Sequence, residues 1–154
     1  MTQKYPISLI IASLLSCFFA IPLTTLGKED DTTLRVFIFA GQSNMVGSDS
    51  KVKDIRRFPP FAGLEEPQRE VRFSYTIGRK NKTISDGWTS LQPVNNIVGP
   101  ELSFARLVTQ NIDAPIAIIK CAAGGTHLGG DWNPETPEGF KMYPLALDLV
   151  RKSL

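Results

Sequence analysis

A serine on a turn is the first residue of this sequence whose type and position could do chemistry. Ser43 comes two residues after Gly41, at the end of the apolar run 34–40. At the carboxyl end of a buried strand, its hydroxyl would lie where α/β proteins bind ligands. At the start of a helix, it would also lie beside N–H groups that are free to stabilise an oxyanion. Ser43 is therefore a candidate nucleophile, and the alternative is a serine that only caps the helix.

Two glycine-containing segments occupy comparable positions in the sequence. The segment 124–126 (Gly-Gly-Thr) follows a second apolar run, 115–123, and the segment 99–101 (Gly-Pro-Glu) opens a predicted helix. Glycine lets a backbone N–H approach a ligand closely, so both segments could complete a site with Ser43. The alternatives are turns without further function, or a phosphate cradle, for which the sequence contains neither G-x-G-x-x-G nor G-x-x-x-x-G-K-[ST].

The elements that must position these residues alternate between strand and helix. The runs 34–40 and 115–123 are almost entirely apolar, which is typical of strands buried on both faces of a parallel sheet. Helices are predicted to begin at 99–101 and near Pro144. This alternation predicts an α/β fold with a mainly parallel sheet, in which 34–40 and 116–122 are neighbouring strands. Ser43, Gly99 and Gly124 are then expected to converge at the carboxyl ends of the strands.

The middle of the chain has a different pattern. Apolar and polar residues alternate over 71–77, which predicts a half-exposed strand. A turn at 78–81 and a return strand within 83–91 complete a predicted β-hairpin. We interpret residues 51–98 as a loop and β-hairpin elaboration on the parallel core.

Composition and charge exclude several classes of function. The chain has 154 residues, enough for one domain, with 17 Lys and Arg against 15 Asp and Glu. This balance provides no concentrated basic face for a nucleic-acid partner. Two cysteines and one histidine exclude a disulfide scaffold and a cysteine-rich zinc site.

The N-terminus has the pattern of an export signal. Lys4 is the only charged residue before Lys28, and an apolar stretch runs from Ile7 to Leu23. This pattern predicts a secretory signal over residues 1–27, export to the periplasm or the extracellular space, and a mature domain over 28–154. The alternative is an uncleaved segment that anchors the protein in the membrane.

Three segments together resemble one family of enzymes. They are Val36-Phe-Ile-Phe-Ala-Gly-Gln-Ser-Asn-Met-Val-Gly47, Gly99-Pro-Glu-Leu-Ser-Phe-Ala105 and Lys120-Cys-Ala-Ala-Gly-Gly-Thr-His-Leu128. In this order they resemble the sialate O-acetylesterase-like carbohydrate esterases, also called carbohydrate esterase family 6, a branch of the SGNH hydrolases. The resemblance implies a three-layer, flavodoxin-like α/β fold and the removal of acetyl groups from sugar hydroxyls, on xylan or on sialic acids. It implies neither a metal nor an organic cofactor.

The resemblance also implies roles for individual residues. Ser43 would be the nucleophile, and its N–H and that of Gly99 would form the oxyanion hole. Asn44 would brace the nucleophile turn through side-chain hydrogen bonds. The other residues expected to support the site, without a chemical step of their own, are Gln42, Glu101, Lys120, Gly124, Gly125 and Thr126.

The sequence departs from the family pattern in its catalytic base. The family carries a histidine in a D-x-x-H motif and an upstream Q-G-E block, and neither occurs here. We therefore expect a truncated chain that corresponds to the N-terminal half of a family domain and has no useful turnover. His127 is the only candidate for a substitute base in the sequence, and the nearby Asp131 and Glu135 could orient it. The alternative for His127 is a loop histidine with no special role. The alternative is a carbohydrate-binding remnant without catalysis.

Overall fold

A five-stranded sheet positions every other element in the described part of the chain. The computed structural model describes residues 33–154. Strands β1 (Arg35–Gly41), β5 (Ile116–Ala122) and β2 (Gln68–Ile77) run parallel, in the spatial order β1-β5-β2. β3 (Thr83–Ile84) and β4 (Thr89–Leu91) each pair antiparallel with β2. The prediction that 34–40 and 116–122 are neighbouring parallel strands is confirmed.

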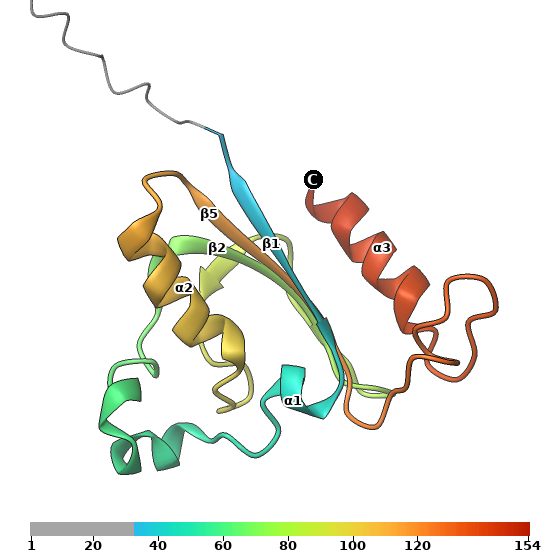
Figure 1. The fold of residues 1–154 in the computed structure, drawn as a ribbon, viewed down its shortest axis with the longest axis horizontal. Coiled ribbons are helices and arrows are strands. Elements are labelled where there is room, and N and C mark those ends of the chain that lie inside the picture. Colours follow the sequence, from blue (N-terminus) through green and yellow to red (C-terminus); the bar gives the residue numbers. More distant parts are fainter. Residues whose placement is uncertain (1–32) are drawn as a thin grey trace, which may run out of the picture. The chain divides into compact units, whose positions relative to one another are not determined.

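Helices cover both faces of this sheet (Figure 1). α2 (Pro100–Asn111) lies on one face and α3 (Met142–Ser153) on the other. Side chains of β5 alternate between the two layers, because successive residues of a strand point to opposite faces. Ile118 packs in the α2 layer, whereas Ile119 and Cys121 pack in the α3 layer. The described residues thus form a three-layer α/β fold with a mostly parallel sheet, as predicted.

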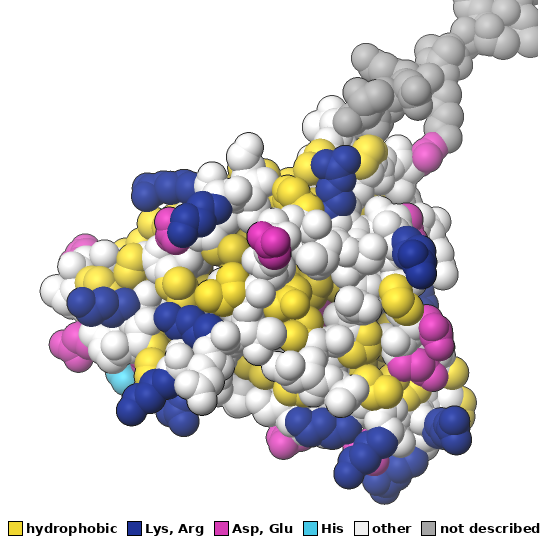
Figure 2. Space-filling view, turned by 180° about the vertical axis from the view of Figure 1, so that it is seen from behind, with side chains coloured by type: hydrophobic (Ala, Val, Ile, Leu, Met, Phe, Trp, Pro, Cys, Tyr) yellow, Lys and Arg dark blue, Asp and Glu magenta, His cyan; other side chains and the backbone are white. Residues whose placement is uncertain are grey.

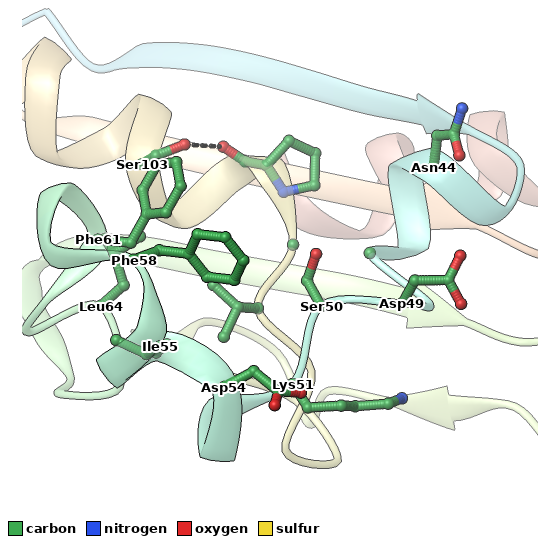
Figure 3. A pocket seen from close by; sticks show the side chains of 14 residues that line it. Asn44, Asp49, Ser50, Lys51, Asp54, Ile55, Phe58, Phe61, Leu64 and Ser103 are labelled. Carbon is green, nitrogen blue, oxygen red and sulfur yellow. Dashed lines mark hydrogen bonds between the residues drawn. The ribbon is translucent and has the colours of Figure 1, made fainter.

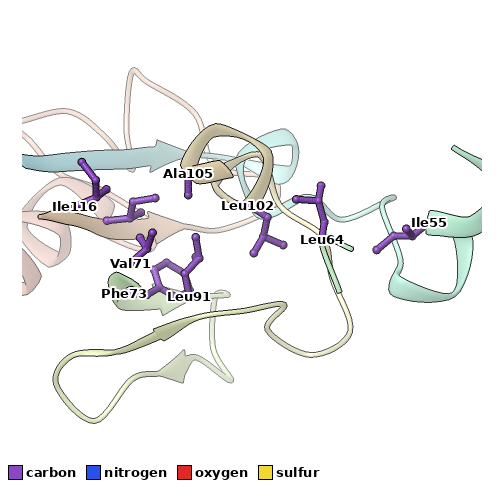
Figure 4. Packing of buried hydrophobic residues seen from close by; sticks show 9 residues of the cluster. Ile55, Leu64, Val71, Phe73, Leu91, Leu102, Ala105 and Ile116 are labelled. Carbon is purple, nitrogen blue, oxygen red and sulfur yellow. The ribbon is translucent and has the colours of Figure 1, made fainter. Parts of the chain in front are cut away.

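The α2 layer contains the larger of the buried clusters. Leu102 and Ala105 project from α2 toward the sheet, where they meet Val71 and Phe73 of β2 (Figure 4). All four side chains are inaccessible to solvent. Burying side chains of this size stabilises a fold by about 1.5–3 kcal/mol each. This packing holds the N-terminus of α2 in place at the end of the sheet.

Both long helices begin near the predicted residues. α2 has Gly99 as its N-cap, Pro100 in its first turn and Glu101 at its positive end, as the sequence predicts. α3 begins at Met142, two residues before the predicted start at Pro144. The Asp131 carbonyl accepts hydrogen bonds from the N–H groups of Met142 and Tyr143, at 2.6 and 3.2 Å. These N–H groups have no partner inside a helix, and Pro144 lacks one, so a proline is tolerated there.

The predicted hairpin forms, but its first strand also belongs to the parallel core. β2 pairs with β3 on one side and in parallel with β5 on the other. The prediction of a half-exposed strand is therefore wrong for the second half of β2, where Ser74 and Thr76 are both 3% exposed. The Ser74 hydroxyl lies under α3 and accepts a hydrogen bond of 2.9 Å from Ser153. A polar residue that looked solvent-facing is buried because a distant helix supplies its partner.

The prediction that the run 34–40 is buried on both faces is wrong: β1 lies at one edge of the sheet of the described residues, and none of its residues is fully buried. Its Ile38 is 57% exposed, which is unusual for an apolar strand.

No helix within 33–154 is long and apolar enough to cross a membrane. The export signal predicted over 1–27, and its cleavage point before Lys28, lie outside the described residues.

Candidate active site

The nucleophile candidate sits where β1 ends. α1 (Ser43–Val46) starts immediately after β1, with Gln42 as its N-cap. Ser43 is therefore the first helical residue and not the cap, so the helix-cap alternative is wrong. The Gln42 Oε1 accepts hydrogen bonds from both the backbone N–H and the hydroxyl of Ser43, at 3.0 and 2.7 Å. The Ser43 N–H predicted for an oxyanion hole is thus occupied by the Gln42 side chain in this structure.

Of the two glycines predicted to converge on Ser43, Gly124 contacts it, and Gly99 contacts Gly47 at the end of α1. A Cβ on Gly124 would lie 3.7 Å from the Ser43 Cβ, so these two residues are in contact. Gly99 is reached through Gly47, which ends α1 with φ of +83°. A Cβ on Gly47 would lie 2.8 Å from the Gly99 Cα, closer than real atoms approach. Glycine at position 47 therefore permits both the left-handed turn and the close contact with Gly99.

A buried ion pair ties these segments together. Lys120 of β5 and Glu101 of α2 form a 2.6 Å salt bridge whose side chains are 1% and 2% exposed. Lys120 Nζ also donates to the Val46 carbonyl at the end of α1, at 3.3 Å. Burial lowers the pKa of Lys120, and the Glu101 carboxylate opposes that effect. One ammonium group thereby links β5, the end of α1 and the first turn of α2.

The same ion pair explains why residue 99 is glycine. A Cβ at this position would collide with both Glu101 carboxylate oxygens and with Lys120 Nζ. The Gly99 N–H donates no hydrogen bond to any residue within 33–154. Because it precedes the first turn of a helix, this N–H belongs to the positive end of the α2 dipole. It is the kind of donor that can bind an oxyanion.

Thr126 and Asp131 hold the loop that follows β5. The Thr126 hydroxyl donates to the Ala123 carbonyl at 2.8 Å and accepts from the Trp132 indole at 3.1 Å. The Asp131 carboxylate accepts from the backbone N–H of Phe140 at 2.7 Å and of His127 at 3.1 Å. These contacts lower the pKa of Asp131, with the Phe140 hydrogen bond as the largest cause. Thr126 and Asp131 both act on the backbone of the loop.

The predicted substitute base, His127, projects from this loop into solvent. Its side chain is 72% exposed, and Nε2 lies 3.6 Å from Asp131 Oδ2. That distance is beyond a hydrogen bond. The structure therefore places Asp131 and His127 near each other at the end of the sheet that carries Ser43. The other predicted orienting residue, Glu135, donates its backbone N–H to the Asn133 side chain.

Asn44 does not brace the nucleophile turn as expected. Its side chain makes no hydrogen bond to any residue within 33–154, and Gln42 makes the bracing contacts instead. Asn44 follows Ser43 by one position, so its side chain points about 100° away around the helix. It is exposed. It lines a cavity of about 430 Å³ beside α1 and the start of α2.

This cavity combines aromatic and acidic side chains (Figure 3). Phe58 lies between the short helices η1 (Val52–Arg57) and η2 (Pro59–Phe61), and Phe61 ends η2. These two rings lie at one end of the cavity, and Asn44 and Asp49 lie at the other. The two phenylalanines are 52% and 47% exposed. Apolar surface with a few polar groups is typical of small-molecule sites. The sequence interpretation missed this region, because its residues come from two distant stretches of the chain, 44–64 and 98–103.

Comparison with known proteins agrees with this geometry. The strand-end serine, the adjacent glycines and the mostly parallel sheet define an α/β protein with an SGNH-like arrangement. The family model described as "Carbohydrate esterase, sialic acid-specific acetylesterase" matches residues 33–154. The chain therefore belongs to this carbohydrate esterase family.

A solved structure agrees with the fold. A protein from Arabidopsis thaliana, known from an X-ray structure, aligns with a TM-score of 0.50 and 21% sequence identity. The alignment covers 77% of this chain and 50% of that protein, so this chain spans about half of its length. No curated protein sequence matches the chain. Within 33–154, no group of three or more His, Cys, Asp or Glu side chains could hold a metal ion.

Proposed function

We propose that this chain carries the nucleophile and part of the oxyanion hole of a carbohydrate O-acetylesterase. The observation that carries the proposal is the position of Ser43, at the end of β1, in contact with Gly124 and tied through Gly47 to Gly99. In the reaction, Ser43 Oγ attacks the carbonyl carbon of an acetyl ester on a sugar. The C–O bond to the sugar then breaks, the sugar leaves as an alcohol, and water hydrolyses the acetyl-serine.

Two donors are proposed to stabilise the tetrahedral intermediate. The Gly99 N–H is available as the structure stands, because it donates to no other described residue. The Ser43 N–H becomes available only when the Gln42 side chain turns away from it. We propose that Gln42 holds Ser43 in the resting state and releases both its N–H and its hydroxyl when substrate enters. Each such donor contributes a factor of about 10²–10³ to kcat.

The catalytic base of the family pattern is not found among the residues of this sequence. No Asp-x-x-His motif occurs in the 154 residues. His127 is exposed and lies 3.6 Å from Asp131, without a hydrogen bond. Loss of the histidine base from a serine hydrolase reduces kcat by about 10⁶-fold. We therefore propose that the 154-residue chain by itself hydrolyses acetylated sugars poorly.

One experiment tests the nucleophile and the base together. Hydrolysis of p-nitrophenyl acetate and of an acetylated sugar is measured for the chain, for Ser43→Ala and for His127→Ala. The same assay is repeated after fusing the C-terminal half of a family member, which supplies the Asp-x-x-His motif. We expect activity only in the fusion and its loss with Ser43→Ala. Fusion activity that survives Ser43→Ala would refute the nucleophile, and unfused activity that is lost with His127→Ala would refute the missing base.

The cavity beside Asn44 favours a second candidate function, carbohydrate binding without turnover. Exposed phenylalanine rings offer apolar surface to the faces of a sugar ring, and Asp49 and Asp54 offer acceptors to its hydroxyls. Binding of an acetylated oligosaccharide that is weakened by Phe58→Ala and unchanged by Ser43→Ala would support this function. An esterase whose substrate lies over Ser43 would respond to both substitutions.

A further inference from the structure

The turn between β2 and β3 brings a cation to the end of the sheet that carries Ser43. Because β2 runs parallel to β5 and β1, its turn emerges at the same end as α1 and Gly124. The Gly78 N–H donates to the Ala122 carbonyl at 2.9 Å, which fastens the turn to the end of β5. The next residue is Arg79, which the sequence interpretation treated only as part of a turn.

Two adjacent glycines lie between Arg79 and the nucleophile. A Cβ on Gly125 would lie 3.3 Å from Arg79 Nη1, and a Cβ on Gly124 would lie 3.7 Å from the Ser43 Cβ. The Cα atoms of neighbouring residues are about 3.8 Å apart. The Arg79 guanidinium and Ser43 therefore lie against neighbouring residues of one dipeptide that has no side chains.

The guanidinium is held in place but has no counter-charge. It lies over the Phe140 ring, 5.2 Å from the centroid. No acidic side chain within 33–154 pairs with it. In the same loop, the Asp131 carboxylate is occupied by the backbone N–H groups of Phe140 and His127.

Further cations belong to the turn that carries Arg79. Lys80 and Lys82 belong to the same turn as Arg79, and all three are exposed. Figure 2 shows Lys and Arg side chains beside the cyan histidine, with acidic side chains also close by, and His127 is the one histidine of the sequence. A local excess of positive charge raises the concentration and the association rate of anionic ligands.

We propose that Arg79 is a specificity-determining residue that binds the carboxylate of an acidic sugar while an acetyl ester of that sugar faces Ser43. A planar guanidinium binds a carboxylate with two parallel hydrogen bonds, which also orients the ligand. A neutral acetylated sugar, such as a xylose unit, offers no group for this contact. The proposal rests on the proposed esterase function and selects sugar acids of the sialic type within it.

The test measures binding, so that it does not depend on hydrolysis. The ligands are the methyl glycoside of 9-O-acetyl-N-acetylneuraminic acid and its carboxyl methyl ester, which has the same shape without the charge. Both are titrated by NMR against the full chain carrying Ser43→Ala, and against the same chain with Arg79→Gln, Arg79→Lys or Lys80→Gln added. We expect the acid to bind about fivefold more tightly than the ester, with a preference that falls as salt is added.

Arg79→Gln should abolish this preference, Arg79→Lys should retain part of it, and Lys80→Gln should retain nearly all of it. The ratio of the two affinities is unaffected by partial unfolding, because unfolding weakens both ligands equally. Equal affinity for acid and ester, no binding of either, or equal loss in the Arg79→Gln and Lys80→Gln chains would overturn the proposal. Ser43-dependent hydrolysis of p-nitrophenyl acetate by the fusion protein would then still stand, so the two proposals fail separately.

Discussion

Two side-chain pairs at the same end of the sheet differ in almost every physical respect. Lys120 and Glu101 are 2.6 Å apart and buried, on β5 and α2. His127 and Asp131 are 3.6 Å apart, and the histidine is 72% exposed. The first pair joins segments that are distant in the sequence, whereas the second lies within one loop. Only the first can set the distance between α1 and the start of α2.

The difference shows which side chains of each pair stabilise the structure. Both members of the buried pair need each other, because a single charge at 1–2% exposure would be very costly. In the loop pair, Asp131 makes its main contacts with the backbone N–H groups of Phe140 and His127. The His127 imidazole adds little to them. The comparison therefore predicts strong effects at Lys120, Glu101 and Asp131, and a weak one at the His127 side chain.

The largest effect is expected for Lys120→Met. This change leaves the Glu101 carboxylate buried without a partner, which costs about 3–5 kcal/mol of the free energy of unfolding. Urea denaturation followed by circular dichroism measures the loss. Lys152→Met is the matched control, because Lys152 pairs with Asp148 at the same 2.6 Å but both side chains are largely exposed. The control should change stability by less than about 0.5 kcal/mol, and a similar loss in both variants would contradict the comparison.

Gly99→Ala should cause the next largest loss of stability. The added methyl group would enter the space between the Glu101 carboxylate and Lys120 Nζ and push the ion pair apart. Overpacking of this kind costs about 1–3 kcal/mol. Gly129→Ala is the control, because a Cβ there meets nothing within 4 Å. A thermal melt in which both variants unfold at the same temperature would show that the space at Gly99 is not constrained by the pair.

Asp131→Ala and His127→Ala separate the two members of the loop pair. Removal of the Asp131 carboxylate leaves the N–H groups of His127 and Phe140 without their acceptor. Amide hydrogen exchange over 127–142 should therefore accelerate in Asp131→Ala. His127→Ala should change overall stability by less than about 0.5 kcal/mol and leave that exchange almost unchanged. Equal acceleration in the two variants would mean that the imidazole holds the loop.

The smallest effect is a change of stability in acid. The Phe140 and His127 hydrogen bonds hold the pKa of Asp131 below its usual value. In acid the unfolded chain then binds more protons than the folded chain, so the stability from this group is present above about pH 4 and is lost as the pH falls further. Melting temperatures between pH 5 and pH 3 should fall less steeply for Asp131→Asn than for the unchanged chain. Identical slopes would count against the loop carboxylate as an acid-labile contact.

The sequence predicted the elements whose signals are local. Continuous apolar runs identified β1 and β5, and the residues around Gly99 identified the start of α2. The solvent exposure of the second half of β2 was predicted wrongly. The alternation of apolar and polar residues shows which face of a strand is polar, but it does not show whether a helix covers that face. Ser74 is buried by Ser153, 79 residues later in the chain. The sequence also could not show whether Asn44 or Gln42 forms hydrogen bonds with Ser43. In the structure the first helical turn directs the Gln42 side chain toward Ser43, and Gln42 makes these bonds.

The position of Ser43 on a strand-end turn was determined by the sequence itself, since strand termination and helix initiation depend on residues within a few positions. The tertiary structure alone decided which groups meet at that end of the sheet. Lys120 and Glu101 pair because the packing of α2 on β5 brings them to the same buried point, and Arg79 reaches Gly125 because β2 lies parallel beside β5. Contacts of this kind depend on strand order and helix packing, which no local pattern of residues encodes.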